Sequence, residues 1–263
     1  MTTGGSFMQN QQPSTLKEIR VHGTQDFPCA FYQTGTRIKG NMVKHHWHEE
    51  VELLYFSGGE FCLEVNMERF NISEECFYVI NPGELHSISV EKNGGCVENA
   101  VVFHMDMLSS AYALDQIQTN LIQPVQNGSI QFPRCLRKNE PAFEPVRKSY
   151  EEIRNVFGGD SFRENYYDGE AVTDDITRQL FIKSALLRIL AVLSANNLFE
   201  VTEKNHDHRI ETIKTTLTYI QENYKEKIYI RDLAGLIGMN EQYFCRFFKK
   251  VIGRSPMEYV NEY

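Results

Sequence analysis

The sequence predicts a multidomain β + α protein, with a barrel or sandwich of strands first, then a helical segment, then a small all-α unit. Between residues 19 and 132, apolar residues alternate with polar ones or form short runs bounded by Gly, Asn and Pro, as strands do. After Pro141 the apolar residues recur every three or four positions, which is the helical period. Beyond residue 229, two short helical patterns are separated by a turn that contains Gly.

Composition narrows the class of protein. The chain has 263 residues and a formal net charge of −8, and its length exceeds that of a common single domain. No stretch approaches the roughly twenty apolar residues of a membrane helix, so we expect no membrane partner. Residues 1–15 are polar and lack the pattern of a secretory signal, which predicts a disordered tail. The six cysteines include no CxxC pair, which argues against a disulfide scaffold or zinc ribbon and favours a reducing cytoplasm.

Strand signals fill the first predicted domain, residues 16–140. Its apolar runs are separated by Gly-Gly, Asn-Pro-Gly and Asn-Gly-Gly clusters, which are typical of turns. The clearest strand candidates are residues 51–56, 61–65, 77–80 and 97–103.

Helices are expected over residues 141–200. The first ends at Gly158-Gly159, and the second runs from about Thr173 to about Asn196 with acidic residues in its first turn. Apolar residues cover more of the circumference of the second helix than one stripe, so it needs two partners. We therefore predict contacts within the monomer and with a second subunit of a homodimer, while burial within a single monomer is the alternative.

The last predicted domain, residues 209–263, follows a short polar linker and carries the signal of a helix-turn-helix. Leu233 and Ala234 lie on an apolar face, Gly238 permits a tight turn, and Asn240 can cap the next helix. That helix turns its aromatic residues to one side. Its predicted DNA-contacting residues, with the cap, are Asn240, Glu241, Gln242, Arg246, Lys249 and Lys250.

Those residue types suit a DNA major groove. Gln can pair with adenine, Arg can bond guanine through two hydrogen bonds, and Lys can hold phosphates. A three-helix packing module with a solvated polar face is the alternative.

The stretch DLAGLIGMNEQYFCRFFKKVIGRSPMEYV resembles the first helix-turn-helix of the AraC family of bacterial transcription regulators. The resemblance implies a second such motif after a long connecting helix. A capping box, Ser255 to Glu258, begins a helix here, yet the sequence ends at Tyr263. We therefore expect that the sequence is truncated and lacks the second motif. The positions that carry the resemblance are Leu233-Ala234, Asn240, Tyr243-Phe244, Arg246, Phe248-Lys249, Gly253, Ser255-Pro256 and Tyr259-Val260.

Histidines and glutamates are concentrated in GNMVKHHWHEEVELLYFSGG, residues 40–59. On an extended strand alternate side chains share a face, so His46, His48 and Glu52 can point the same way. The spacing resembles the first motif of cupin barrels. The second cupin motif is matched less well, because Pro82 lies one place closer to the following Gly than usual, but His86 keeps its place and can supply a fourth ligand.

Three histidines and one glutamate suit a divalent transition metal such as Zn, Ni, Mn or Fe. We predict His46, His48, Glu52 and His86 as tentative metal ligands, and the same four with His104 as effector-pocket residues. AraC-type regulators often have a cupin-like effector domain with similar His and Glu residues. The resemblance therefore also permits a pocket in which these residues bind a small ligand or one another.

Together these features predict a cytoplasmic, ligand-responsive transcription regulator that is not an enzyme and needs no cofactor. A cupin-like barrel binds a small-molecule effector, the helical segment dimerises, and the C-terminal unit of the full-length protein binds DNA. A carbohydrate is the first effector class that the resemblance implies, with oligopeptides, aromatic acids and a bare metal left open. The alternative is a metal-dependent cupin enzyme, an oxygenase or isomerase, with an incidental helical tail.

Overall fold

The chain divides into two compact units, a β-rich one within Glu18–His206 and a helical one near the C-terminus. The predicted tail, residues 1–15, lies outside the residues that the structure describes. The computed structural model describes residues 17–18, 20–36, 39–90, 92, 96–112, 114–158, 167–168, 175–202 and 208–261.

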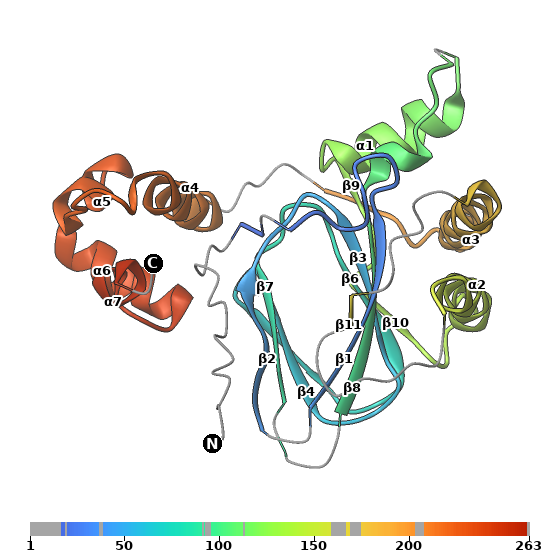
Figure 1. Ribbon diagram of the computed structural model, residues 1–263, viewed down its shortest axis with the longest axis horizontal. Helices are drawn as coiled ribbons and strands as arrows, with labels where there is room; N and C mark the ends of the chain where they lie inside the picture. Colours follow the sequence, from blue (N-terminus) through green and yellow to red (C-terminus); the bar gives the residue numbers. More distant parts are fainter. Residues whose placement is uncertain are drawn as a thin grey trace, which may run out of the picture. The chain divides into compact units, whose positions relative to one another are not determined.

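Two antiparallel sheets form the cupin-like barrel of the first unit (Figure 1). The first sheet has the spatial order β10 (Cys135–Arg137), β6 (Cys76–Ile80), β3 (Val51–Phe56), β8 (Cys96–Phe103), β1 (Cys29–Thr36) and β11 (Tyr167–Asp168). The second has the order β2 (Gly40–His46), β7 (His86–Val90), β4 (Phe61–Val65) and β5 (Glu68–Ile72). A third, two-stranded sheet pairs β12 (Glu200–Val201) with β9 (Ile130–Gln131).

An apolar core fills the space between the two main sheets. Leu54 and Phe56 from β3 meet Phe61 and Leu63 from β4, and all four are almost completely buried. Alternation along each strand sends these residues inward. The predicted strands are confirmed here, because each of the four clearest candidates overlaps a strand of the barrel.

Two helices cover the outer face of the six-stranded sheet (Figure 1). These are α2 (Phe143–Val156) and α3 (Ile176–Ala195), both predicted. Asp175 caps α3 by accepting hydrogen bonds from the first-turn amides of Thr177 and Arg178. Tyr150 of α2 is fully buried against the sheet, with its ring 5.3 Å from that of Phe77.

The predicted run of strands to residue 132 is wrong in its last part. After β8 the chain forms short helical segments: η1 (Met105–Leu108), η2 (Gln118–Ile122) and α1 (Gln123–Gln126). In η2 and α1 the buried residues are Ile122 and Val125, three positions apart, which fits a helix and not the two-residue period of a strand.

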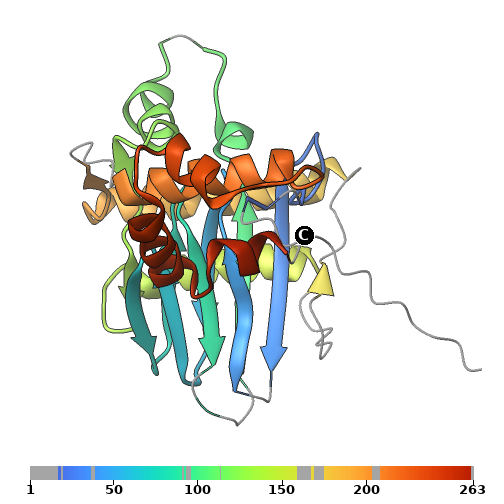
Figure 2. The same ribbon diagram turned by 90° about the vertical axis from the view of Figure 1, so that its left-hand side faces the viewer.

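Four helices form the second unit: α4 (His208–Asn223), α5 (Ile230–Leu236), α6 (Glu241–Ile252) and α7 (Pro256–Val260) (Figure 2). The predicted helix caps and the predicted turn are confirmed. Asn240 accepts a hydrogen bond from the amide of Tyr243, Gly238 has a φ of 66°, and Ser255 forms a capping box with Glu258. Phe244 and Phe248 are fully buried in this unit.

Membrane insertion finds no support in the described residues. None of their helices combines the length and the apolarity that crossing a bilayer would need.

Candidate functional site

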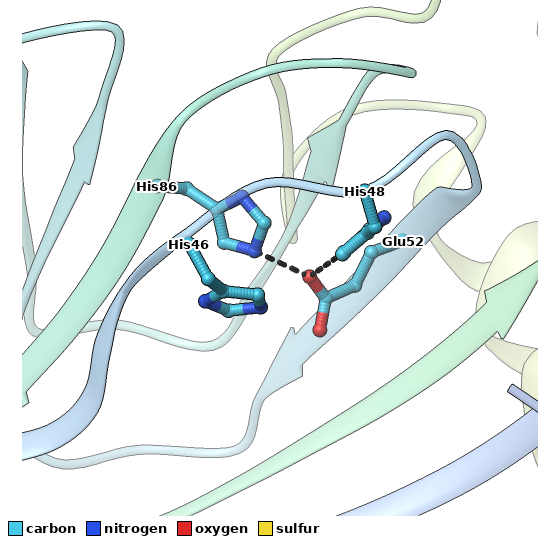
Figure 3. Close-up of side chains that lie close together, drawn as sticks. All are labelled: His46, His48, Glu52 and His86. Atoms are coloured by element: carbon cyan, nitrogen blue, oxygen red, sulfur yellow. Dashed lines mark hydrogen bonds and ion pairs between the residues drawn. The ribbon is translucent and has the colours of Figure 1, made fainter. Parts of the chain in front are cut away.

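Three histidines and one glutamate meet inside the barrel (Figure 3). His46 ends β2 and His86 begins β7, and the two are paired across the sheet, with their rings 4.2 Å apart. His48 follows β2, and Glu52 projects from β3. Their ligand atoms all lie within 4.8 Å of one another. The structure therefore brings together the four residues that the sequence predicts as metal ligands.

Backbone carbonyls orient all three imidazole rings. A carbonyl oxygen accepts from Nδ1, so the proton sits on that nitrogen in the neutral ring and the lone pair of Nε2 points to the centre. The three bonds run from His46 to Lys44 O (2.9 Å), from His48 to Glu50 O (3.2 Å) and from His86 to Glu84 O (2.9 Å).

Glu52 supplies the negative charge at the centre. Its Oε2 lies 3.0 Å from His86 Nε2 and 3.4 Å from His48 Nε2. Burial by itself would raise the pKa of Glu52, but the interactions of its carboxylate with His48 and His86 outweigh it and hold that pKa well below its usual range. The carboxylate stays ionised while it is buried.

The histidines respond differently to this environment. Burial and the nearby His86 lower the pKa of His46 to about 3. Burial would also lower the pKa of His48, but its hydrogen bond to Glu52 prevails and raises it above the ordinary value. One imidazole is thus held neutral, and its neighbour favours the charged form.

A turn held by the ion pair of Glu84 with Arg134 positions two of these histidines. Glu84 is buried, accepts a hydrogen bond from the amide of Asn81 (2.8 Å), and forms a two-pronged ion pair with Arg134. The same turn donates the Gly83 amide to the backbone carbonyl of His48 (2.7 Å). Glu84 O also orients the His86 ring. The turn therefore links His86, at the start of β7, to His48, which follows β2.

Glu18 and His22 also belong to the site, although no spacing in the sequence predicts them. They lie ahead of β1, and Glu18 Oε2 is 3.3 Å from His46 Nε2 and 3.4 Å from His22 Nε2. Burial raises the pKa of Glu18, but the hydrogen bond to His22 and the nearby His46 lower it overall. An isolated histidine shortly before a strand was the available signal, and it is too common to identify a site.

His104 was predicted in the pocket, but the structure does not bring it to the four-residue cluster. It follows β8, caps η1 by accepting from the Asp106 amide (3.2 Å), and is about one-third exposed. None of the described ring contacts or ion pairs joins it to the other histidines. β8 ends at Phe103, so His104 lies just beyond the strand and begins the next helical turn instead of projecting from the sheet.

The convergence fits a divalent cation. His86 Nε2 is buried and has no hydrogen-bond partner of acceptable geometry, although Glu52 is close. Three imidazole lone pairs beside a carboxylate repel one another unless a proton or a metal ion lies between them. Nitrogen and oxygen ligands of this kind suit Zn, Ni, Mn or Fe.

An apolar cavity lies elsewhere, between the six-stranded sheet and the covering helices. It is lined by Phe77, Val79 and Leu190 among other apolar residues, and its volume is about 20 Å³. A space of that size holds about one water molecule, and it has no polar wall to orient a ligand. The barrel interior is therefore the better candidate for an effector site.

The second candidate site is the outer surface of α6. The predicted residues Glu241, Gln242, Arg246, Lys249 and Lys250 are all exposed, while the aromatic residues between them are largely buried, except Tyr243. Asn240 is exposed too, but its side-chain oxygen is engaged by the helix cap. A helix with this polar face and a tight turn before it can enter a major groove.

Comparisons with known protein families match both the barrel and the C-terminal helical unit. Residues 34–154 match the AraC-like ligand binding domain, and residues 220–261 match the bacterial regulatory helix-turn-helix proteins of the AraC family, so that the two together span more than half of the chain. The chain belongs to the AraC family. It is a DNA-binding transcription regulator with a cupin-like effector-binding domain.

One relative in sequence and two solved structures are similar to this chain. An uncharacterized HTH-type transcriptional regulator of Bacillus subtilis, YdeC, is 25% identical over 256 residues, covering 94% of this chain and 79% of that protein. Among solved structures, an apo variant of ToxT from Vibrio cholerae is 10% identical with a TM-score of 0.43, covering 92% of this chain and 80% of that one. A predicted oxalate decarboxylase from Thermotoga maritima is 24% identical with a TM-score of 0.27, covering 28% and 67%.

The depressed pKa of His46 predicts acid destabilisation of the metal-free protein. Its pKa is 6.5 ordinarily and about 3 in the fold, so between these values the unfolded chain binds the proton and the folded chain does not. Stability therefore falls as the pH is lowered below 6.5. Between pH 6.5 and about pH 5 we expect a loss of about 2 kcal/mol that His46→Gln does not show.

Urea unfolding at the two pH values, followed by the fluorescence of the single tryptophan, Trp47, measures this difference. His48 does not mask it. Because its pKa is raised, its contribution is complete below pH 6.5 and is lost only as the pH rises through the higher folded value. Equal pH dependence in the wild type and His46→Gln would contradict the prediction.

Proposed function

We propose that this chain is a ligand-responsive regulator that reads a specific DNA sequence, with its small-molecule effector bound at the histidine centre of the barrel. The main support is that one AraC-family chain carries both a convergent, polar, buried centre and an exposed recognition-type helix. Effector binding favours one arrangement of the protein and so changes how two DNA-reading halves meet their half-sites. The protein acts in the cytoplasm, where such DNA is accessible.

For the effector, a carbohydrate is the first class to test, because adjacent hydroxyl groups can bind imidazoles, carboxylates or a metal ion. Turnover is not part of the proposal, since the AraC-family matches favour a regulator over a cupin oxygenase or isomerase.

We also propose that His46, His48, Glu52 and His86 hold a divalent transition metal. The metal would act as a Lewis acid that anchors an oxygen atom of the effector. The protein residues fix its position, because each imidazole is already oriented by a backbone carbonyl.

Elemental analysis tests the metal site. Wild-type protein purified without chelator is expected to hold close to one metal ion per chain, and His86→Ala at least tenfold less, because a buried ligand is lost. His104→Ala is the matched control and keeps the metal, since His104 lies outside the cluster. Absence of metal from the wild type, or full retention in His86→Ala, would contradict the proposal.

DNA selection tests the recognition helix. In the full-length protein, Arg246→Ala should relax base preference at one position at a cost of about 1–3 kcal/mol, because a guanidinium can bond guanine in two places. Lys250→Ala should instead weaken all sequences alike and reduce the salt dependence by about one charge. Selection from random duplexes, with affinities at several salt concentrations, measures both. An unchanged preference at every position in Arg246→Ala defeats its assigned role.

A homodimer through α3 completes the proposal. The helix buries Leu186 and Leu190 within the monomer but leaves Ile176, Leu180 and Phe181 between 60% and 72% exposed. An exposed apolar row of this kind on a helix of one subunit fits the same row on its partner.

Sedimentation equilibrium measures this association. Phe181→Glu should raise the dimer dissociation constant at least about tenfold, since a charge replaces an apolar contact. Met67→Glu is the matched control, because Met67 is an exposed apolar residue in the turn between β4 and β5. A monomeric wild type, or a Phe181→Glu protein that dimerises as well as the wild type, would rule out this interface.

A further inference from the structure

A second group of potential ligands adjoins the histidine centre. Glu18, His22 and His48 offer ligand atoms within 4.8 Å of one another, and Glu18 Oε2 is also 3.3 Å from His46 Nε2. Glu18 does not belong to the four-residue centre, and it comes from the chain ahead of β1. A carboxylate is therefore held at the edge of the centre by a residue outside its strands.

His22 gives this carboxylate a built receptor. It is only 2% exposed, and its buried Nε2 lies 3.4 Å from Glu18 Oε2. Its Nδ1 lies 2.8 Å from the hydroxyl of Tyr32. When this hydroxyl donates to Nδ1, the proton of His22 is on Nε2 and can be donated to a carboxylate.

A positively charged side chain, Arg20, lies beside the tyrosine that contacts His22. The guanidinium of Arg20 lies over the ring of Tyr32, 4.8 Å from its centroid. The surroundings of Glu18 thus include the imidazole of His22 and the phenol of Tyr32, with a guanidinium over the phenol ring. Such groups favour an anionic ligand over a neutral one.

We propose that Glu18 occupies a carboxylate-binding subsite beside the histidine centre, and that the effector carries a carboxylate group that takes its place. The inference rests on the proposed function and narrows the effector class. Exchange of one carboxylate for another leaves the charge of the buried site unchanged, so the remaining contacts of the effector decide the balance. A sugar acid would satisfy both this subsite and a carbohydrate-binding centre.

Displacement of the Glu18 side chain by an effector can be observed through the fluorescence of Trp47. The amide of Glu18 donates to the carbonyl of Trp47, at 2.9 Å, and Trp47 lies between His46 and His48 in the sequence. Movement of Glu18 therefore changes the surroundings of the single tryptophan of the chain.

Chemical rescue with acetate tests the subsite. Glu18→Ala leaves space for a small carboxylate, so acetate should bind it saturably within about 50 mM, raise its Tm by about 3 °C and change Trp47 emission. Acetamide, which has the same shape without the charge, should change neither the Tm nor the Trp47 emission of Glu18→Ala. Glu18→Gln fills the space without a charge, and it should stay insensitive to acetate, as should the wild type, in which the attached carboxylate competes at high effective concentration.

Identical responses of Glu18→Ala to acetate and acetamide would overturn the subsite. Glu18→Ser provides the same space if Glu18→Ala fails to fold.

The carboxylate subsite and the proposed regulatory function can fail separately. Discovery of a neutral sugar as a tight-binding effector would remove the carboxylate class but leave the regulator in place. Failure of the full-length protein to select any DNA sequence would remove the proposed function and leave the acetate result intact.

Discussion

The buried carboxylate of Glu84 is the constraint on which the site depends. A charge of this kind is stable away from water only when its oxygens are fully bonded, and Arg134 with the Asn81 amide supplies the bonds. Those partners fix the turn between β6 and β7. Through Glu84 O and the Gly83 amide, the turn then fixes the His86 ring and the His48 backbone. The ion pair thus sets the geometry of His86 and His48, although neither of its two side chains bonds to a histidine.

In the centre that this turn supports, electron-rich atoms lie close enough together to repel one another. Imidazole lone pairs and two carboxylates, Glu52 and Glu18, face a small volume in which several of the atoms are buried. The pKa values of His46 and His48 shift in opposite directions, because burial prevails in His46 while nearby carboxylates, Glu52 above all, outweigh burial in His48. A bound cation would relieve this repulsion, and occupancy of the centre would then be linked to the folding of the barrel.

Local signals explain why the helical unit could be predicted closely from sequence. The Asn240 cap, the turn at Gly238 and the Ser255–Glu258 capping box all act within a few residues of chain. The barrel depends instead on pairings between distant strands. His46 and His86 are forty residues apart in sequence, and only the antiparallel pairing of β2 with β7 sets them opposite each other.

The sequence by itself determined the strands up to β8, the helices α2 and α3, the helix-turn-helix, and a candidate ligand set of His46, His48, Glu52 and His86. Spacing and period record the faces of such regular elements. Tertiary structure decided the rest. It added Glu18 and His22, and it separated His104 from the cluster, because those placements depend on how irregular chain crosses the barrel and where a strand ends. No periodic pattern records such contacts, since they are made by packing between segments and not within them.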